Sequence, residues 1–170
     1  LVIIKSRNDT HDWYVRTPAL SGTEFLVLNT TAAKGTSSPE VWNSTVPTSS
    51  VVNIGTSIGV NRNTYNYVMY CFAEIPGYSS VGSYTGNGST GTGGVFVHCG
   101  FTPAMVILKR TNSAQEWQIY DNQRSPTNVM SKLLKPNDSA AEVDNAPGDN
   151  EISFLSNGFQ LNEDNGGMNA

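Results

Sequence analysis

The sequence MVILKRTNSAQEWQI, residues 105–119, repeats a pattern that the chain has already used in LVIIKSRNDTHDWYV, residues 1–15. Aligned without a gap, the two stretches keep a constant offset (106 − 2 = 104) and share five identical residues, which in the first copy are Val2, Ile3, Lys5, Asn8 and Trp13. Since solenoid repeats have periods of roughly 20–50 residues, a period this long indicates a whole domain. Each copy has an apolar run, a turn-forming cluster and a return strand, so the sequence predicts a β-hairpin in each of two tandem units.

The repeat continues beyond the hairpin at a slightly longer offset. LVLNTTAA, residues 26–33, matches LKPNDSAA, residues 134–141, so that Asn29 corresponds to Asn137 (137 − 29 = 108). About four residues are therefore inserted between the hairpin and this match in the second copy (108 − 104 = 4). We predict a first unit at residues 1–79 and a second at residues 80–170, with the first strands missing from the first unit and the last strand missing from the second.

Composition and patterning favour an all-β chain. Charged residues are only 14% of the sequence, against about 25% in typical domains, and the many Gly, Asn, Ser and Thr residues suit short strands and turns. We therefore predict tandem antiparallel β-sandwich units of the jelly-roll kind. YNYVMYCFA, residues 65–73, is apolar on both faces and predicts a central strand, and the short apolar runs 51–54 and 58–60 predict two more strands. Because the chain begins in the middle of a strand pattern, we expect it to be a segment of a longer polypeptide.

Charge and cysteine content limit the classes of partner. The net charge is −4, which argues against a nucleic-acid partner, because nucleic-acid-binding proteins carry basic surfaces. No apolar run is long enough to predict insertion into a membrane. Cys71 and Cys99 each lie in an apolar, strand-like run, so we expect small buried side chains rather than a disulfide.

No motif predicts catalysis. Residues 86–91, GNGSTG, satisfy GxGxxG, but a dinucleotide-binding loop must open a helix, and here a predicted strand, 95–99, follows. His98 and Cys99 are adjacent on that strand and point to opposite faces, so they do not form a nucleophile–base pair. The other histidine, His11, corresponds to Gln115 in the second copy. We therefore expect that the chain is not an enzyme.

Two groups of residues are candidates for ligand binding. Trp42 and Asn43 lie in the Ser/Thr-rich segment 30–50, where an exposed tryptophan would suit stacking on a sugar; Trp13 and Trp117 recur at one repeat position and are predicted core residues. The oxygen ligands of Asp144, Asp149 and Glu151 surround a turn, as they would in a Ca²⁺ loop, although the spacing is not that of an EF-hand. A solvated acidic loop is the alternative interpretation, and otherwise no cofactor is predicted.

Several stretches together resemble a known family: VILKRTNSAQEWQIYDNQR, VWNSTVPTSSVVNIGTS, YVMYCFAEIPGYSSVGSYTGNGS and FLSNGFQLNEDNGGMNA. They are similar to an uncharacterised repeat family of tail-fibre and related virion proteins of marine bacteriophages. In that family a YTGNG segment opens a unit, a hairpin with Lys-Arg and Trp follows, and a Tyr- and Phe-rich strand closes it.

The resemblance implies laminin-G-like or lectin-type sandwich units and a structural role in a virion, in a tail fibre or a similar appendage that attaches to the host surface. It implies other virion proteins as partners, a homotrimer, a host glycan or protein as receptor, and location in the virion. It carries no catalytic residues. The alternative function is a carbohydrate-binding, lectin-like domain of a surface or secreted protein.

Overall fold

The computed structural model describes residues 1–145 and 148–170 of the chain. All regular structure in these residues is β, apart from one turn of 3₁₀ helix, η1 (Gly91–Gly93), and every strand pairing is antiparallel. The all-β prediction is confirmed. The described residues contain no helix with the length and hydrophobicity needed to cross a membrane.

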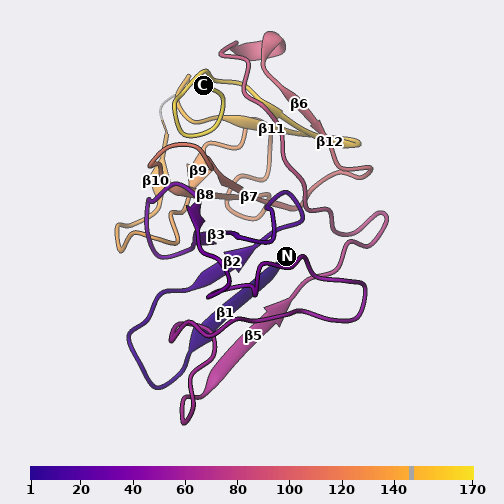
Figure 1. The fold of residues 1–170 in the computed structure, drawn as a ribbon. Helices are drawn as coiled ribbons and strands as arrows, with labels where there is room; N and C mark the ends of the chain where they lie inside the picture. Colours follow the sequence, from indigo (N-terminus) through magenta and orange to yellow (C-terminus); the bar gives the residue numbers. More distant parts are fainter. Residues whose placement is uncertain (146–147) are drawn as a thin grey trace. The chain divides into compact units, whose positions relative to one another are not determined.

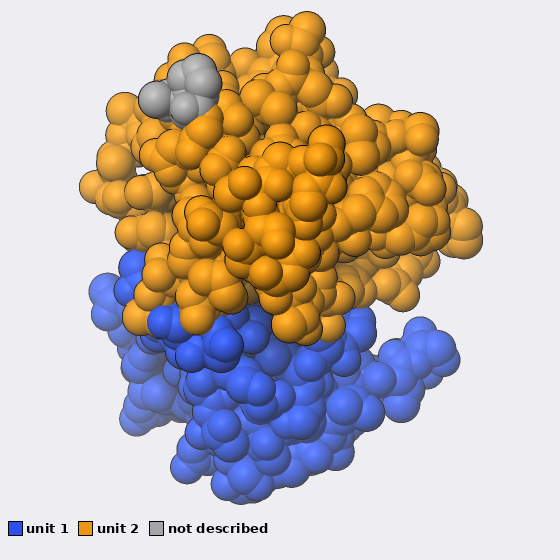
Figure 2. All heavy atoms as spheres, turned by 90° about the horizontal axis from the view of Figure 1, so that it is seen from above, with its two compact units in different colours: residues 1–73, 111–113 blue, residues 74–110, 114–170 orange. Residues whose placement is uncertain are grey.

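The chain forms two compact units, one of residues 1–73 with 111–113 and the other of residues 74–110 with 114–170 (Figure 2). The first ends at Ala73 rather than at the predicted Ser79. The difference has a local cause, because β5 ends at Cys71 and Ile75 then forms a separate bridge with Ser79. The turn of the second hairpin, residues 111–113, also clusters with the first unit, a grouping that the repeat pattern did not predict.

The first unit is built on one five-stranded sheet, with strand order β4-β3-β2-β1-β5 (Figure 1). Alternate residues of β1 are buried, as the period of a strand requires when one face meets a core. That core contains Val2, Ile4, Val41, Trp42 and Val60. The strands are β1 (Val2–Ser6), β2 (Tyr14–Arg16), β3 (Glu24–Val27), β4 (Gly35–Thr36) and β5 (Tyr67–Cys71).

The second unit contains three smaller antiparallel sheets with strand orders β11-β12-β6, β7-β8 and β10-β9. A bridge between Ile119 and Leu134 joins β8 to the residue that follows β9. Side chains from all three sheets meet in one core, which includes Leu108, Tyr120, Leu133, Ile152 and Leu161. The strands are β6 (Phe96–His98), β7 (Met105–Lys109), β8 (Trp117–Asp121), β9 (Lys132–Leu133), β10 (Val143–Asp144), β11 (Ile152–Leu155) and β12 (Gly158–Leu161).

The two hairpins predicted from the repeat pair in the same register. Ile3 lies opposite Val15 in the first, and the equivalent Ile107 lies opposite Ile119 in the second. The third strand keeps this register too, because Val15 pairs with Leu26 and Ile119 bridges to Leu134. The insertion of four residues is therefore confined to the connection between the second and third strands.

A matching pair of asparagines holds each hairpin to its third strand. Asn29 Oδ1 accepts the backbone N–H of Trp13 over 2.9 Å, and its Nδ2 donates to Asp12. In the second unit Asn137 Oδ1 accepts the backbone N–H of Trp117 over 2.8 Å, and its Nδ2 donates to Glu116. These bonds confirm the Asn29–Asn137 correspondence that the sequence predicted.

Three expectations about individual elements are wrong: the central position of the strand at 65–73 and the two short strands at 51–54 and 58–60. β5, predicted to be central, is the edge strand beside β1, with Met69 and Tyr70 exposed. Residues 51–60 form no strand; Gly55 N–H instead bonds to Val41 O and Ser57 N–H to Glu40 O. Their counterparts in the second unit, β11 and β12, do pair as strands, and β6 extends their sheet.

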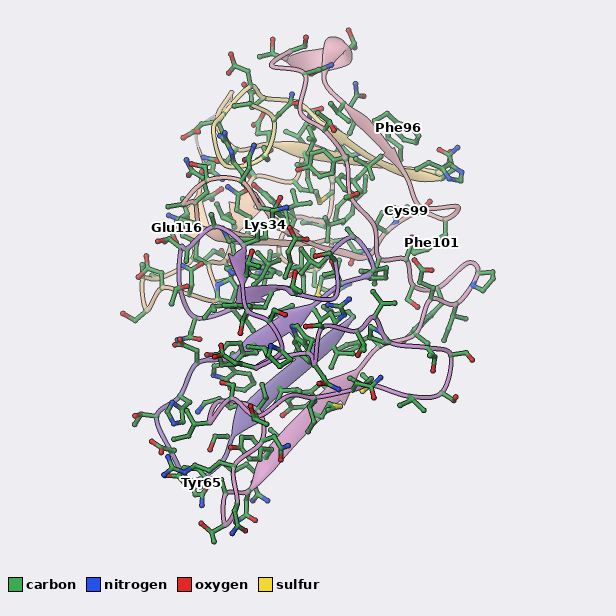
Figure 3. All side chains as sticks on the ribbon, viewed as in Figure 1. Lys34, Tyr65, Phe96, Cys99, Phe101 and Glu116 are labelled. Atoms are coloured by element: carbon green, nitrogen blue, oxygen red, sulfur yellow. The ribbon has the colours of Figure 1, made fainter. Side chains whose placement is uncertain are left out.

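The cysteines and the repeated tryptophans are only partly as expected. Both thiols are free, but Cys71 is exposed rather than buried, because it lies at the end of an edge strand. Cys99 is half-buried, and Figure 3 shows it just after Phe96 and the end of β6. Trp117 is buried as predicted, whereas Trp13 is half-buried and stacks on Tyr70 with the ring centroids 6.4 Å apart.

Candidate functional site: an amide-lined pocket

The structure does not place Trp42 where a ligand could reach it. The ring is completely buried among Val2, Ile4 and Val60, and the guanidinium carbon of Arg16 lies 6.0 Å from its centroid. The prediction that Trp42 stacks on a sugar is therefore wrong, because the polar segment around it folds over the sheet. The neighbouring Asn43 is exposed, with a left-handed φ of 52°.

The predicted Ca²⁺ ligands do not come together. Asp144 Oδ1 accepts a hydrogen bond from Ser131 Oγ over 3.3 Å, Asp149 Oδ1 accepts one from Asn150, and Glu151 is buried. Within residues 1–145 and 148–170 no group of three or more His, Cys, Asp or Glu side chains is placed to hold a metal ion. Residues 146 and 147, between the predicted ligands, lie outside the described part of the chain.

The pocket of interest lies in the second unit, beside β8, and has a volume of about 420 Å³. Four segments that are distant in sequence build it: the start of β8, the residues around β9, the segment after β10, and the loop at 165–167. Neutral amide side chains predominate in the lining, with Glu116, Asp149 and Lys135 as the charged groups; Figure 3 marks Glu116. The amides are Gln115, Gln118, Asn145, Asn150 and Asn165.

Hydrogen bonds fix the wall of the pocket around Asn150. The Tyr120 hydroxyl donates to the carbonyl oxygen of Asn150 over 2.8 Å and lies 3.1 Å from Gln118 Oε1. Gln118 Nε2 and Asn165 Nδ2 both donate to Asn150 Oδ1. Burial raises the pKa of the Tyr120 phenol, so this hydroxyl remains a donor throughout the neutral range. The result is a preorganised polar wall rather than a set of freely rotating side chains.

Two glycines lie close to the amide side chains of the pocket. A Cβ at Gly167 would lie 2.7 Å from Gln118 Nε2, and one at Gly166 would lie 3.3 Å from Gln115 Nε2. The loop is also anchored, because Arg110 Nη1 donates to Gly166 O over 2.8 Å and Gly167 N–H donates to Asn165 Oδ1 over 2.9 Å. A side chain at 167 would displace the end of Gln118, and one at 166 would shift Gln115 slightly, so the two glycines let the loop lie close against these amides.

Chemically, the pocket offers donors and acceptors at fixed positions with little net charge. Amide groups both donate and accept, so they match hydroxyl groups, which do the same. Such a lining suits a neutral polyhydroxylated ligand, above all a sugar, better than a phosphate or a nucleic acid. Two residues of the lining stand out in the sequence: Gln115, which replaces His11 of the first copy, and Asp149, one of the predicted Ca²⁺ ligands.

Fold and pocket together define an all-β protein with a repeated hairpin unit and a polar surface pocket. The chain belongs to the family described as "Domain of unknown function (DUF7483)", whose sequence model matches residues 1–170. No curated protein and no solved structure matches the chain.

Proposed function

We propose that this chain is a structural module of a bacteriophage virion, part of a tail fibre or similar appendage that takes part in attachment to the host surface. The observation that carries the proposal is the repeated hairpin, in which Ile3–Val15 and Ile107–Ile119 pair in the same register. A protein that repeats one β unit along its chain can become elongated without a new fold for each segment. The motif resemblance to virion repeat proteins supports the same function. The proposal includes other virion proteins as partners, a homotrimer and no catalytic role.

Location in the particle tests this proposal directly. The connection after β8 carries the natural insertion of four residues, so a short epitope tag placed between the exposed residues Pro126 and Thr127 should leave the strand ladders intact. Immunogold labelling of intact particles is expected to place the tag on an appendage. Particles that contain no tagged protein, although the tagged chain is expressed, would contradict the proposal. Light scattering of the appendage protein is expected to give a trimer.

We infer a second candidate function, recognition of a carbohydrate, from the amide-lined pocket. The amides of Gln118, Asn150 and Asn165 are bonded to one another and form a fixed wall. Beside this wall the side chains of Gln115 and Lys135 offer the polar groups that sugar hydroxyls require. This function is compatible with the first, because an attachment appendage can use a glycan as its receptor.

A glycan array probed with the 170-residue chain tests the second function. We expect binding that Gln115→Ala and Lys135→Ala each reduce at least about tenfold, the effect of losing one well-made polar contact. Gln123→Ala is the matched control, because Gln123 is an exposed glutamine that is not part of the pocket. An array without signal, or equal losses in all three variants, would remove the pocket as a sugar site.

A further inference from the structure

The outer edge of β7, the edge away from β8, presents backbone groups that no described strand pairs with. Asn122 N–H bonds to Ala104 O over 3.0 Å, and hydrogen-bonded pairs alternate along an antiparallel ladder. The N–H and C=O groups of Val106 and Leu108 therefore face β8, and those of Met105 and Ile107 face outward. Among the described residues β7 has a ladder with β8 alone.

The equivalent edge of the first unit is occupied. β5 pairs antiparallel with β1, with Ile3 opposite Tyr70. Leu1 and Phe72 exchange both backbone hydrogen bonds, at 2.9 and 2.8 Å. Figure 1 shows β5 along the outer edge of β1. Because β1 and β7 are equivalent by sequence and by hairpin register, the β1–β5 ladder is a template for what the edge of β7 can bind.

Side-chain exposure shows the effect of the absent partner strand. Leu1 and Ile3, which lie opposite β5, are half-buried. Their equivalents Met105 and Ile107 are 58% and 43% exposed. An unpaired edge that also carries exposed apolar side chains is the surface on which strand addition is most favourable.

We propose that the outer edge of β7 is an acceptor site for an antiparallel strand of the β5 type, with aromatic or large apolar side chains at alternate positions. The β1–β5 register gives the alignment: the residue at the position of Tyr70 lies opposite Ile107, and the residue at the position of Phe72 lies opposite Met105. The added strand satisfies the outward backbone groups and covers both side chains. The site ends before the turn, where Thr111 O already accepts the N–H of Lys34 over 2.8 Å. The proposal does not depend on the proposed function.

A synthetic peptide of residues 64–74, with Cys71→Ser to prevent disulfide exchange, is the probe. Added to the ¹⁵N-labelled 170-residue chain, it is expected to slow amide hydrogen exchange at Met105 and Ile107. Val106 and Leu108 are internal references, since their N–H groups already face β8. A peptide of the same composition in scrambled order is expected not to protect these amides.

N-methylation of the peptide provides a control that leaves the protein unchanged. Methyl groups on the amide nitrogens of Tyr70 and Phe72, which would face β7, should weaken binding at least about tenfold by removing two edge hydrogen bonds. Methyl groups on the nitrogens at positions 69 and 71, which face away, should change it by less than about threefold. No binding, or equal effects of the two methylation patterns, overturns the proposal. Protection of Met105 and Ile107 that rises with protein concentration in the absence of peptide, and that added peptide does not change, also overturns it, in favour of pairing between the β7 edges of two copies of the chain.

Discussion

Asn137 Oδ1 accepts a hydrogen bond from the backbone N–H of Trp117, twenty positions earlier in the chain, over 2.8 Å. Asn29 makes the equivalent bond to Trp13 over 2.9 Å. Each asparagine thus holds the start of the second hairpin strand to the end of the third strand. The equivalence of the two units can therefore be tested by replacing one asparagine in each.

Replacement of either asparagine by alanine is expected to destabilise its own unit. Asn137→Ala removes the acceptor of a part-buried N–H, which costs about 1–3 kcal/mol. Asn29→Ala acts where the contact is exposed, so water replaces the acceptor and the cost is about 0.5–1 kcal/mol. Urea unfolding followed through hydrogen exchange in each unit measures both effects. Equal losses in the two variants would show that burial does not set the strength of this contact.

Trp42 is expected to contribute to stability rather than to binding. Its ring is fully buried, so Trp42→Ala should cost about 3–5 kcal/mol through the cavity it leaves. Trp42→Phe should cost about 1–2 kcal/mol, because the indole N–H has no hydrogen-bond partner within the described residues and none is lost. Thermal unfolding gives both values, and a Trp42→Phe loss as large as that of Trp42→Ala would contradict the account.

The ion pair between Glu24 and Lys34 predicts a pH dependence. Lys34 Nζ lies 2.6 Å from Glu24 Oε1, and this bond, together with the backbone N–H of Ser21, lowers the pKa of Glu24 from 4.5 to about 2. Because the pKa is lower in the folded chain, the stabilisation is complete above about pH 4.5 and is lost as the pH falls towards about 2.

An NMR titration of the Glu24 side-chain carboxyl carbon measures this pKa without unfolding the protein. Lys34→Met is expected to raise the pKa towards 4.5 and to leave the smaller effect of the Ser21 N–H. A Glu24 that titrates at its ordinary value in the unaltered protein would contradict the ion pair.

The two free thiols should differ in reactivity. Cys71 is exposed and Cys99 is half-buried, and burial raises the pKa of the Cys99 thiol. Since the thiolate is the nucleophile, Cys99 should react with a disulfide reagent at least about tenfold more slowly at neutral pH. The single-thiol variants Cys71→Ser and Cys99→Ser separate the two rates, and equal rates would show that Cys99 is as accessible as Cys71.

The sequence repeat predicted the two hairpins and their equivalence. Because side chains alternate along a strand, a shift of one residue would reverse the buried face, so Val2 and Val106 fix the same register in both hairpins. The match of Asn29 with Asn137 even located a tertiary contact. The pattern of β5 showed only that both faces carry apolar side chains, however, and that pattern does not distinguish a central strand from an edge strand.

The site was harder to predict because tertiary structure builds it. The pocket joins segments as distant as Gln115 and Gly167, and no short motif connects them. Trp42 was wrongly predicted to be exposed because its neighbours in the sequence are polar, which is typical of a surface loop. The backbone of that segment satisfies its own polar groups, as when Asn43 N–H bonds to Pro39 O, so the loop can cover a core.

The four residues inserted between Ile119 and Leu134 leave the ladder unchanged. Lengthening the segment between the paired residues from ten residues (16–25) to fourteen (120–133) costs only about 0.3 kcal/mol in closure entropy. The exposed residues Pro126 and Thr127 therefore mark a natural permissive position, between the buried Ser125 and the bridged Met130, where a peptide of chosen sequence can be grafted for display. The equivalent turn of the first unit, residues 17–23, offers no such position, because Leu20 is buried and the Arg16 guanidinium donates to the carbonyl oxygens of Leu20 and Ser21.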